Sequence, residues 1–265
     1  MEIGNGIVKD GDDVLILLED GTTYLLKVRR GKTFGTHLGN LRYDEMIGKN
    51  FGDFLRIEKG KAYILKPGMD DYIRKMKRAT QIVYPKDIGY ILIMLDVKNG
   101  DRIIDAGLGS GAMCGALARY VGENGRIYAY ERREKFVEIA RENLRRWGVL
   151  ERVEIKLRDV EEGFDEKDVD AIFLDLPEPW CCLDKAWNSL KFSGRIGIIC
   201  PTTNQVQKVL LEMENLGFVR TKVWEIMHRE YKPNPERLRP VDRMVAHTAY
   251  LIFGIKVKTG KECES

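Results

Sequence analysis

The 265-residue sequence has few of the residues that mark metal centres and disulfide frameworks, and it has no long apolar run. Only three histidines and five cysteines are present, and no two cysteines have the C-x-x-C spacing of a zinc site. Uncharged runs such as residues 244–255 fall well short of the roughly 18 apolar residues that a membrane-spanning helix needs. The N-terminus shows no apolar segment of the signal-peptide kind. We therefore expect a cytoplasmic protein with no metal site and no membrane span.

The charge balance is nearly even, because 44 Lys and Arg residues face 41 Asp and Glu residues, for a net charge of +3. So small a net charge does not by itself indicate a nucleic-acid partner. Charged residues nevertheless make up 32% of the chain, above the usual quarter, which is typical of heat-adapted proteins. The hydrophobic fraction of 44% is that of a globular protein. Composition therefore predicts a folded protein from a thermophile and leaves its partners open.

The pattern of the chain changes near residue 70, which predicts two domains. Residues 1–70 contain two hairpin signals, one around a two-residue turn at Asp20 and Gly21 and one around residues 58–61. These signals predict a small N-terminal β domain, a barrel or half-barrel. Residues 71–265 form the second predicted domain.

Helix and strand signals alternate through the second domain. A helical stripe covers residues 88–95, and further helices are predicted at 112–120, 134–147 and 206–216. Short apolar strands are predicted at 102–105, 126–130, 153–157, 170–174 and 195–200. Alternation of this kind predicts an α/β, Rossmann-like fold, a mostly parallel sheet with helices on both faces.

The sharpest chemical signal is the stretch DAGLGSG at residues 105–111, which leaves a strand and enters a helix. Glycines there let the backbone approach a ligand closely, and the helix N-terminus offers N–H groups to it. Gly107, Gly109 and Ala112 also fit the dinucleotide pattern, so NAD is a rival ligand on spacing alone. Asp105 favours S-adenosylmethionine, because a carboxylate repels a pyrophosphate and accepts hydrogen bonds from an ammonium group.

Three further acids follow strands of the predicted sheet. Glu131 ends the strand after the glycine motif, where a carboxylate accepts the ribose hydroxyls of either cofactor class. Asp159 can accept from an adenine amino group, or it can be a turn former, which is as common a role for an isolated Asp in a loop. Asp175 opens the stretch DLPEPW at residues 175–180 and lies at the strand ends where α/β sheets bind ligands. Trp180 is either a stacking face or a packed core residue.

Basic residues gather in two places that the small net charge conceals. Residues 66–86 hold six Lys or Arg against two acids, and residues 219–243 hold seven against four. Aromatic residues lie nearby, which favours RNA binding over a merely solvated surface. The candidate RNA-binding residues are Lys77, Arg78, Arg237, Arg239 and Arg243.

These motifs together resemble class I S-adenosylmethionine-dependent methyltransferases and, more closely, the tRNA adenine-N1 methyltransferase (TrmI) family. The resemblance runs along nearly the whole chain and includes Glu131, HLG at 37–39 and MIGK at 46–49 in the β domain, TQIVYPKD at 80–87, DAGLGSG at 105–111, RDVEEG at 158–163, DLPEPW at 175–180 and RPVDRMVAHTAYL at 239–251. It implies methylation of N1 of adenine 58 in the T-loop of tRNA by a homotetramer. Archaeal relatives also act on position 57, which the sequence leaves open for this chain, since it carries tyrosine at position 84 where some relatives carry histidine.

The resemblance also implies roles for individual residues. It makes Asp175 the contact to the target base, with Gln81 closing over the cofactor. The implied cofactor-binding set is Gln81, Asp105, Gly107, Leu108, Gly109, Ser110, Gly111, Ala112, Glu131, Asp159, Val160 and Asp175.

The chemistry is plausible on physical grounds as well. N1 of adenine already has a free lone pair, so the site must mainly align it with the methyl group and stabilise the developing cation. Asp175 can do so through the exocyclic amino group. Tyr84 is the candidate to hold the extruded base, with ordinary packing as the alternative. Three alternatives stay open: a methyltransferase for another substrate, a non-catalytic tRNA-binding subunit and, less favoured, an NAD-dependent dehydrogenase.

Overall fold

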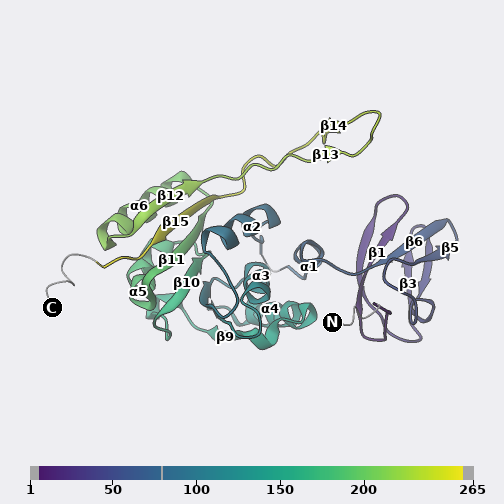
Figure 1. Cartoon of the computed structure of the whole chain (residues 1–265), viewed down its shortest axis with the longest axis horizontal. Coiled ribbons are helices and arrows are strands. Elements are labelled where there is room, and N and C mark those ends of the chain that lie inside the picture. Colours follow the sequence, from purple (N-terminus) through teal and green to yellow (C-terminus); the bar gives the residue numbers. More distant parts are fainter. Residues whose placement is uncertain (1–5, 79, 259–265) are drawn as a thin grey trace. The chain divides into compact units, whose positions relative to one another are not determined.

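The computed structural model of the chain describes residues 6–78 and 80–258 and divides into two compact units (Figure 1). The first unit is Met1–Met76 and the second is Lys77–Ser265. This boundary lies beyond residue 70 because helix α1 (Met69–Lys75) packs against strand β2 (Thr23–Lys27). Lys75 Nζ also donates a hydrogen bond to the Thr23 carbonyl at 2.9 Å. The division into domains at residues 1–70 and 71–265 stays a prediction.

Antiparallel strands make up most of the first unit. One sheet has four strands in the order β2-β1-β6-β5, and a second sheet is the β3-β4 hairpin. Their bounds are β1 Asp13–Leu18, β3 Thr33–Thr36, β4 Gly39–Arg42, β5 Phe54–Ile57 and β6 Gly60–Leu65, with the short 3-10 helix η1 at Tyr43–Glu45. Their shared apolar core includes Ile16, Leu41, Met46 and Ile64, all fully buried.

Both predicted hairpins are present, but two details differ from expectation. The Leu18 N–H donates to the Thr22 carbonyl at 2.9 Å, so the first loop has three residues, with Gly21 in the left-handed region at φ 86°. A left-handed glycine ending such a loop is the usual solution for three residues. The four-stranded sheet is also open, with β2 and β5 at its edges, rather than a closed barrel.

The second unit contains a seven-stranded sheet in the order β12-β15-β11-β10-β7-β8-β9. All neighbouring pairs are parallel except those of β15, which runs antiparallel to β11 and β12. The strand bounds are β7 Arg102–Ala106, β8 Arg126–Glu131, β9 Val153–Leu157, β10 Val169–Leu174, β11 Leu190–Cys200, β12 Val219–Trp224 and β15 Tyr250–Ile255. The predicted α/β, Rossmann-like architecture is confirmed.

Helices cover both faces of this sheet (Figure 1). Helices α2, α3 and α4 lie on one face and α5 and α6 on the other. Their bounds are α2 Pro85–Met94, α3 Ala112–Tyr120, α4 Glu134–Trp147, α5 Leu183–Ser189 and α6 Thr203–Leu216. No helix within the described ranges combines the length and the apolar character needed to cross a bilayer.

Between β12 and β15 the chain forms a long excursion, residues 225–249, which we call the arm. Its middle is a two-stranded hairpin of β13 (Tyr231–Lys232) and β14 (Arg239–Pro240). Figure 1 shows the arm reaching away from the sheet of its own unit. Both roots of the arm therefore lie at one end of the adjacent strands β12 and β15.

Candidate functional site

The loop after β7 and the loop after β10 are locked together. The Asp175 N–H donates to the Ala106 carbonyl at 2.6 Å. A side chain at Gly107 would place its Cβ only 2.3 Å from the Asp175 carbonyl oxygen, and Gly107 has a φ of 53°. Only glycine fits both the close approach and the left-handed backbone. The glycine motif thus brings Asp175 directly against the start of the loop.

Asp105, at the end of β7, is a buried carboxyl with no hydrogen bond of normal geometry to either oxygen among the described residues. Burial raises the pKa of Asp105 to about 8, and the charges of Asp175 and Glu131 act in the same direction. The Cys114 thiol of α3 is one polar neighbour, and burial raises the pKa of that thiol as well. A buried carboxyl without a partner is costly unless a ligand completes it, and a cationic ligand fits best.

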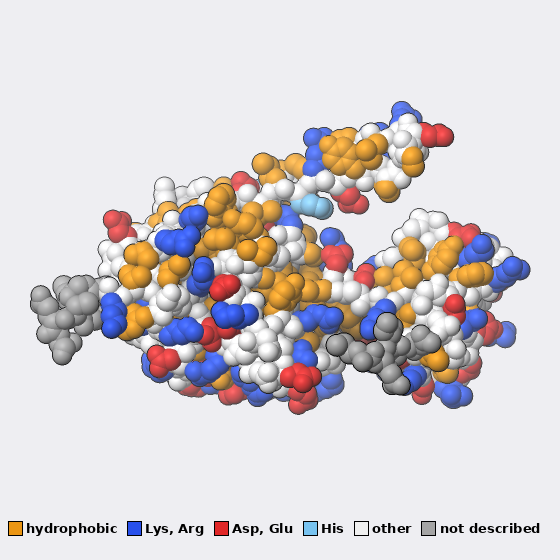
Figure 2. All heavy atoms as spheres, viewed as in Figure 1, with side chains coloured by type: hydrophobic (Ala, Val, Ile, Leu, Met, Phe, Trp, Pro, Cys, Tyr) orange, Lys and Arg blue, Asp and Glu red, His pale blue; other side chains and the backbone are white. Residues whose placement is uncertain are grey.

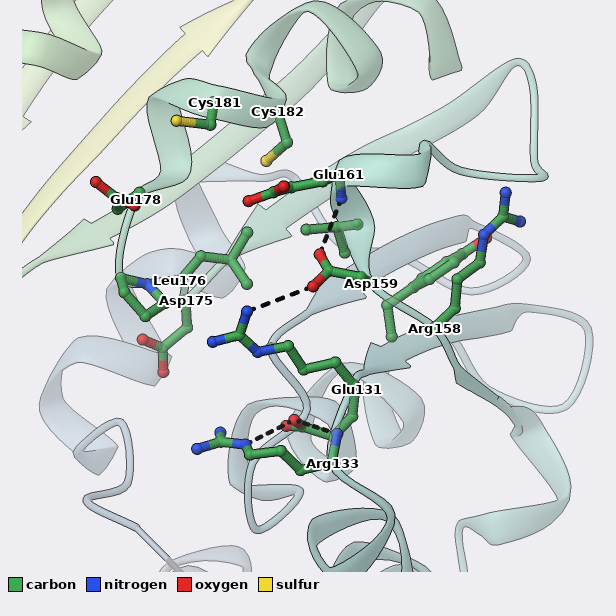
Figure 3. A pocket seen from close by; sticks show the side chains of 15 residues that line it. Glu131, Arg133, Arg158, Asp159, Glu161, Asp175, Leu176, Glu178, Cys181 and Cys182 are labelled. Atoms are coloured by element: carbon green, nitrogen blue, oxygen red, sulfur yellow. Dashed lines mark hydrogen bonds and ion pairs between the residues drawn. The ribbon is translucent and has the colours of Figure 1, made fainter.

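Glu131, at the end of β8, is buried and held from both sides. Its Oε2 accepts from the Gly109 N–H at 3.2 Å, and its Oε1 accepts from the N–H and Nε of Arg133 at 3.1 and 3.0 Å (Figure 3). The carboxylate is therefore fixed beside the glycine loop, where the sequence analysis expected it.

Asp159 caps the 3-10 helix η3 (Val160–Glu162), because its Oδ1 accepts from the Glu161 N–H at 3.1 Å. Its Oδ2 lies 3.4 Å from Nη1 of Arg132 (Figure 3). Asp159, Glu131 and Asp175 line one pocket, which we call the glycine-loop pocket, and Asp105 is not among its lining residues. Its walls are Gly107, Tyr130, Glu131, Arg132, Arg133, Arg158, Asp159, Val160, Glu161, Asp175, Leu176, Pro177, Glu178, Cys181 and Cys182.

Asp175 is also part of the wall of a second pocket, which we call the Tyr84 pocket. It is lined by Gln81, Ile82, Val83, Tyr84, Asp87, Asp175, Ile199, Pro201, Val245, His247, Thr248 and Ala249. Asp175 lines both pockets. A group in one pocket and a group in the other can therefore meet beside its carboxylate.

Asp175 is exposed to solvent, although protein atoms are crowded around it. This partial loss of hydration, together with the charge of Glu131, raises the pKa of Asp175 to about 6. The carboxyl is accordingly ionised at neutral pH and ready to accept a hydrogen bond.

Gln81 and Tyr84 are joined to each other, because Gln81 Nε2 donates to the Tyr84 hydroxyl at 2.7 Å. Tyr84 caps the N-terminus of α2 with extended backbone geometry, and Pro85 follows as the first helical residue. Gln81 lines the Tyr84 pocket and also a small cavity with Gly107, Leu108, Gly109, Ser110 and Ala112. Gln81 is not among the residues that line the glycine-loop pocket, so its contacts are with the Tyr84 pocket and with the glycine loop itself.

The structure separates the candidate RNA-binding residues into two places. Lys77 Nζ pairs with Glu142 of α4 at 2.6 Å, and Arg78 is exposed beside it. Arg237, Arg239 and Arg243 are exposed on the arm. There Asp242 lies 3.2 Å from Arg239 and offsets part of the positive charge.

Several site residues escaped the sequence analysis. Asn143 of α4 links the segment at Lys77 to the glycine loop at Ser110. Its Nδ2 donates to the carbonyls of these two residues at 2.8 and 2.9 Å. A polar side chain on the apolar face of the predicted helix was the signal in the sequence that could have identified it. Pro201 and His247 come from distant loops, and only the fold brings them to Asp175.

Trp180 is half-buried and packs against the core of the sheet, while Lys208 Nζ lies 4.4 Å from its ring centroid. This arrangement favours the packed over the stacking interpretation. Among the described residues, no group of three or more His, Cys, Asp or Glu side chains is arranged to hold a metal ion.

The parallel sheet, the glycine loop after its first strand and the acids after the next strands define a class I S-adenosylmethionine-dependent methyltransferase. The family described as "tRNA methyltransferase complex GCD14 subunit" matches residues 60–247. The TrmI tRNA (adenine(57)-N(1)/adenine(58)-N(1))-methyltransferase of Methanocaldococcus jannaschii is 35% identical over 264 residues, covering 89% of this chain and 92% of the relative. The chain belongs to this GCD14 and TrmI family, and it is an enzyme of the methyltransferase type.

Two solved structures are similar over nearly the whole chain. The tRNA (m1A58) methyltransferase TrmI of Aquifex aeolicus is 35% identical with a TM-score of 0.85, covering 96% of this chain and 100% of that one. A SAM-dependent O-methyltransferase of Thermotoga maritima is 55% identical with a TM-score of 0.92, covering 96% of each chain.

Proposed function

We propose that this chain transfers a methyl group from S-adenosylmethionine to N1 of adenine 58 in tRNA. The observation that carries the proposal is the position of Asp175 between the glycine-loop pocket and the Tyr84 pocket. A methyl donor in the first pocket and an adenine in the second would meet at this carboxylate. The named activities of the relatives support the choice of substrate.

The glycine-loop pocket fits the cofactor. The unpartnered carboxyl of Asp105 suits a ligand that carries an ammonium or sulfonium charge, and Glu131 is fixed to accept ribose hydroxyls. Asp159 and Val160 are proposed to contact the adenine of the cofactor, and residues 107–112 to line its path. When bound, the cofactor supplies the electrophilic methyl group.

The Tyr84 pocket is proposed to receive the target base, extruded from the T-loop. The N1 lone pair of adenine needs no base to become a nucleophile, so the pocket must orient it and offset its developing charge. Asp175 would accept from the exocyclic amino group, which becomes a better donor as N1 is methylated. Tyr84, oriented by its hydrogen bond with Gln81, would hold the ring.

Modification of the neighbouring position 57 is a further proposal, supported by the name of the Methanocaldococcus jannaschii relative. This chain has tyrosine at position 84, so a test of position 57 also tests whether that residue permits a second target.

We propose that tRNA is held by Arg78, the arm arginines and, where its pair with Glu142 opens, Lys77. The enzyme is proposed to act in the cytoplasm of a thermophile as a homotetramer. Figure 2 shows hydrophobic side chains gathered on the arm with Lys and Arg side chains among them. Met227, Leu238 and Val245 are 70%, 69% and 64% exposed, which supports contact between subunits through this segment.

O-methylation is the second candidate, because the 55%-identical structure carries that name. Such a reaction requires removal of a hydroxyl proton by a base. Labelled S-adenosylmethionine is therefore incubated with an unmodified tRNA transcript and, separately, with a panel of small phenols and catechols. Transfer to tRNA alone is expected. Transfer to the hydroxyl compounds without transfer to tRNA would replace the proposal, and tight tRNA binding without any transfer would support a non-catalytic subunit.

A further inference from the structure

The roots of the arm are fastened beside the Tyr84 pocket by two side chains, Lys86 and His247. The first root follows β12 at Glu225 and Ile226, and the second precedes β15 at His247 and Thr248. Four residues of the contacts described below, Asp87, Pro201, His247 and Thr248, also line the pocket. The geometry of the roots therefore shapes the pocket wall.

Lys86 forms the inner fastening. Its Nζ donates to the Ile226 carbonyl at 2.6 Å, to Thr248 Oγ1 at 2.7 Å and to Asp87 Oδ1 at 2.8 Å. Thr248 Oγ1 donates in turn to Asp87 Oδ2 at 3.0 Å. The Lys86 and Asp87 side chains are only 13% and 1% exposed, so this fastening is largely shielded from water.

His247 forms the outer fastening. Its Nδ1 lies 2.6 Å from Glu225 Oε1, and its Nε2 lies 2.9 Å from the Pro201 carbonyl oxygen. A carbonyl and an ionised carboxylate both only accept hydrogen bonds, so the two contacts require a proton on each ring nitrogen. The imidazolium thus joins three segments: the first root, the second root and the loop after β11.

The surroundings favour this doubly protonated form. The Pro201 carbonyl and then Glu225 raise the pKa of His247 above its ordinary value of 6.5, while the charge of Lys86 opposes them. The ring of Tyr250 from β15 lies 4.8 Å from the imidazole centroid. The Asp87 carboxylate of α2 is already paired with Lys86.

We propose that His247, with a proton on both ring nitrogens, is a positioning residue that holds the arm and the Pro201 loop as the wall of the target-base pocket. The role of the pocket rests on the proposed function. Loss of one proton leaves only one of the two contacts, so one segment is released. Because the pKa of His247 is raised, both contacts are present below pH 6.5, and one of them is lost as pH rises through the raised pKa.

The fastening can be tested without any activity. Mass spectrometry of the exchange of the imidazole carbon hydrogen gives the pKa of each of the three histidines in the full chain. Backbone hydrogen exchange of residues 225–249 is measured on the wild type and on His247→Gln at matched pH values. The control is His228→Gln, an exposed histidine of the same arm. We expect the pKa of His247 to be raised. At pH 6.5 the arm should be more protected from exchange in the wild type and in His228→Gln than in His247→Gln. At pH 9 the three proteins should show the same protection.

Glu225→Gln tests whether the charge of Glu225 sets the pH at which His247 loses its contact, which a merely structural contact would not do. Glutamine still accepts from Nδ1 but brings no charge, so the midpoint of the pH-dependent release should move to lower pH while the arm stays protected in acid. In the tRNA assay we expect His247→Gln to raise KM for tRNA about tenfold at pH 6.5, the value of one charged hydrogen bond, with the Kd for S-adenosylmethionine unchanged.

Two outcomes would overturn the inference: a His247 pKa at or below 6.5, or equal arm protection in His247→Gln and wild type at every pH. If His247→Gln loses protection of the arm but keeps an unchanged KM for tRNA, His247 holds the arm but does not position the wall of the target-base pocket. If the wild type fails to methylate tRNA, the proposed function fails, and the exchange measurements still decide the fastening.

Discussion

Replacing Asp105 by asparagine should make the cofactor-free enzyme more stable and at the same time weaken cofactor binding. The folded-state pKa of Asp105 is about 8 against an ordinary value of 3.8, with burial as the main cause. A carboxyl whose folded pKa is raised stabilises the chain fully at low pH, and the stability falls as pH rises through the folded pKa. Asparagine has no such proton to bind.

The magnitude follows from the size of the shift. Each pH unit above 3.8 costs the wild type about 1.4 kcal/mol until pH 8 is reached, so the penalty at pH 7 is on the order of 4 kcal/mol. Because this figure assumes that the Asn amide finds partners as good as those of the neutral carboxyl, it is an upper bound.

Guanidinium unfolding of the cofactor-free wild type and Asp105→Asn at pH 5, 7 and 9 measures the difference. The stability gain of the variant should grow from pH 5 to pH 7 and level off above pH 8. Asp87→Asn is the matched control, since that buried carboxylate is paired with Lys86 and Thr248 and its loss should destabilise the chain. A gain that is absent, or equal at all three pH values, would refute the reasoning.

The same carboxyl should release a proton when the cationic cofactor binds. At pH 7 a group with a pKa of about 8 is about nine-tenths protonated, so calorimetry in buffers of different ionisation enthalpy should detect release of up to about 0.9 proton. Asp105→Asn should release none from this position. Identical proton release by both proteins would show that Asp105 does not face the cofactor.

Three further predictions concern the other site residues. Asp175→Asn should lower kcat at least about a hundredfold and leave the Kd for S-adenosylmethionine within about twofold. Wild-type kcat should fall as pH drops through about 6. A matching loss of cofactor affinity in the variant would make Asp175 a cofactor ligand instead. Glu131→Ala should weaken cofactor binding by calorimetry at least about tenfold, and an unchanged Kd would contradict the ribose assignment. Arg243→Ala should raise KM for tRNA and reduce its salt dependence, with small-molecule binding unaffected; an unchanged salt slope would remove the arm from the RNA contact.

Much of the fold could be predicted because its signals are local. Helices α3 and α4 and strand β9 have the predicted bounds, since their apolar periodicity is strong and glycine or a turn ends each one. Strands β3 and β4 escaped prediction because four-residue strands rich in Gly and polar residues carry no alternation. Helix α5 was also missed, because seven residues are too few to show a clear helical period.

The site divides in a similar way. The glycine loop, Glu131 and Asp175 lie directly after strands, so their positions follow from the chain order and the parallel sheet. The fastening of His247 to Pro201 and Glu225 joins positions 46 and 22 residues away in the sequence. Only the pairing of β15 between β11 and β12 brings these positions together, and no local pattern encodes it.

The central claim is tested most directly by mapping the methyl group on a tRNA transcript. The transcript is incubated with the enzyme and S-adenosylmethionine, and its nucleosides and fragments are analysed by mass spectrometry, with a second transcript that carries guanosine at position 58 as control. We predict 1-methyladenosine at position 58 of the first transcript and none at that position of the second. Methylation on an oxygen, or at a base outside the T-loop, would contradict the account.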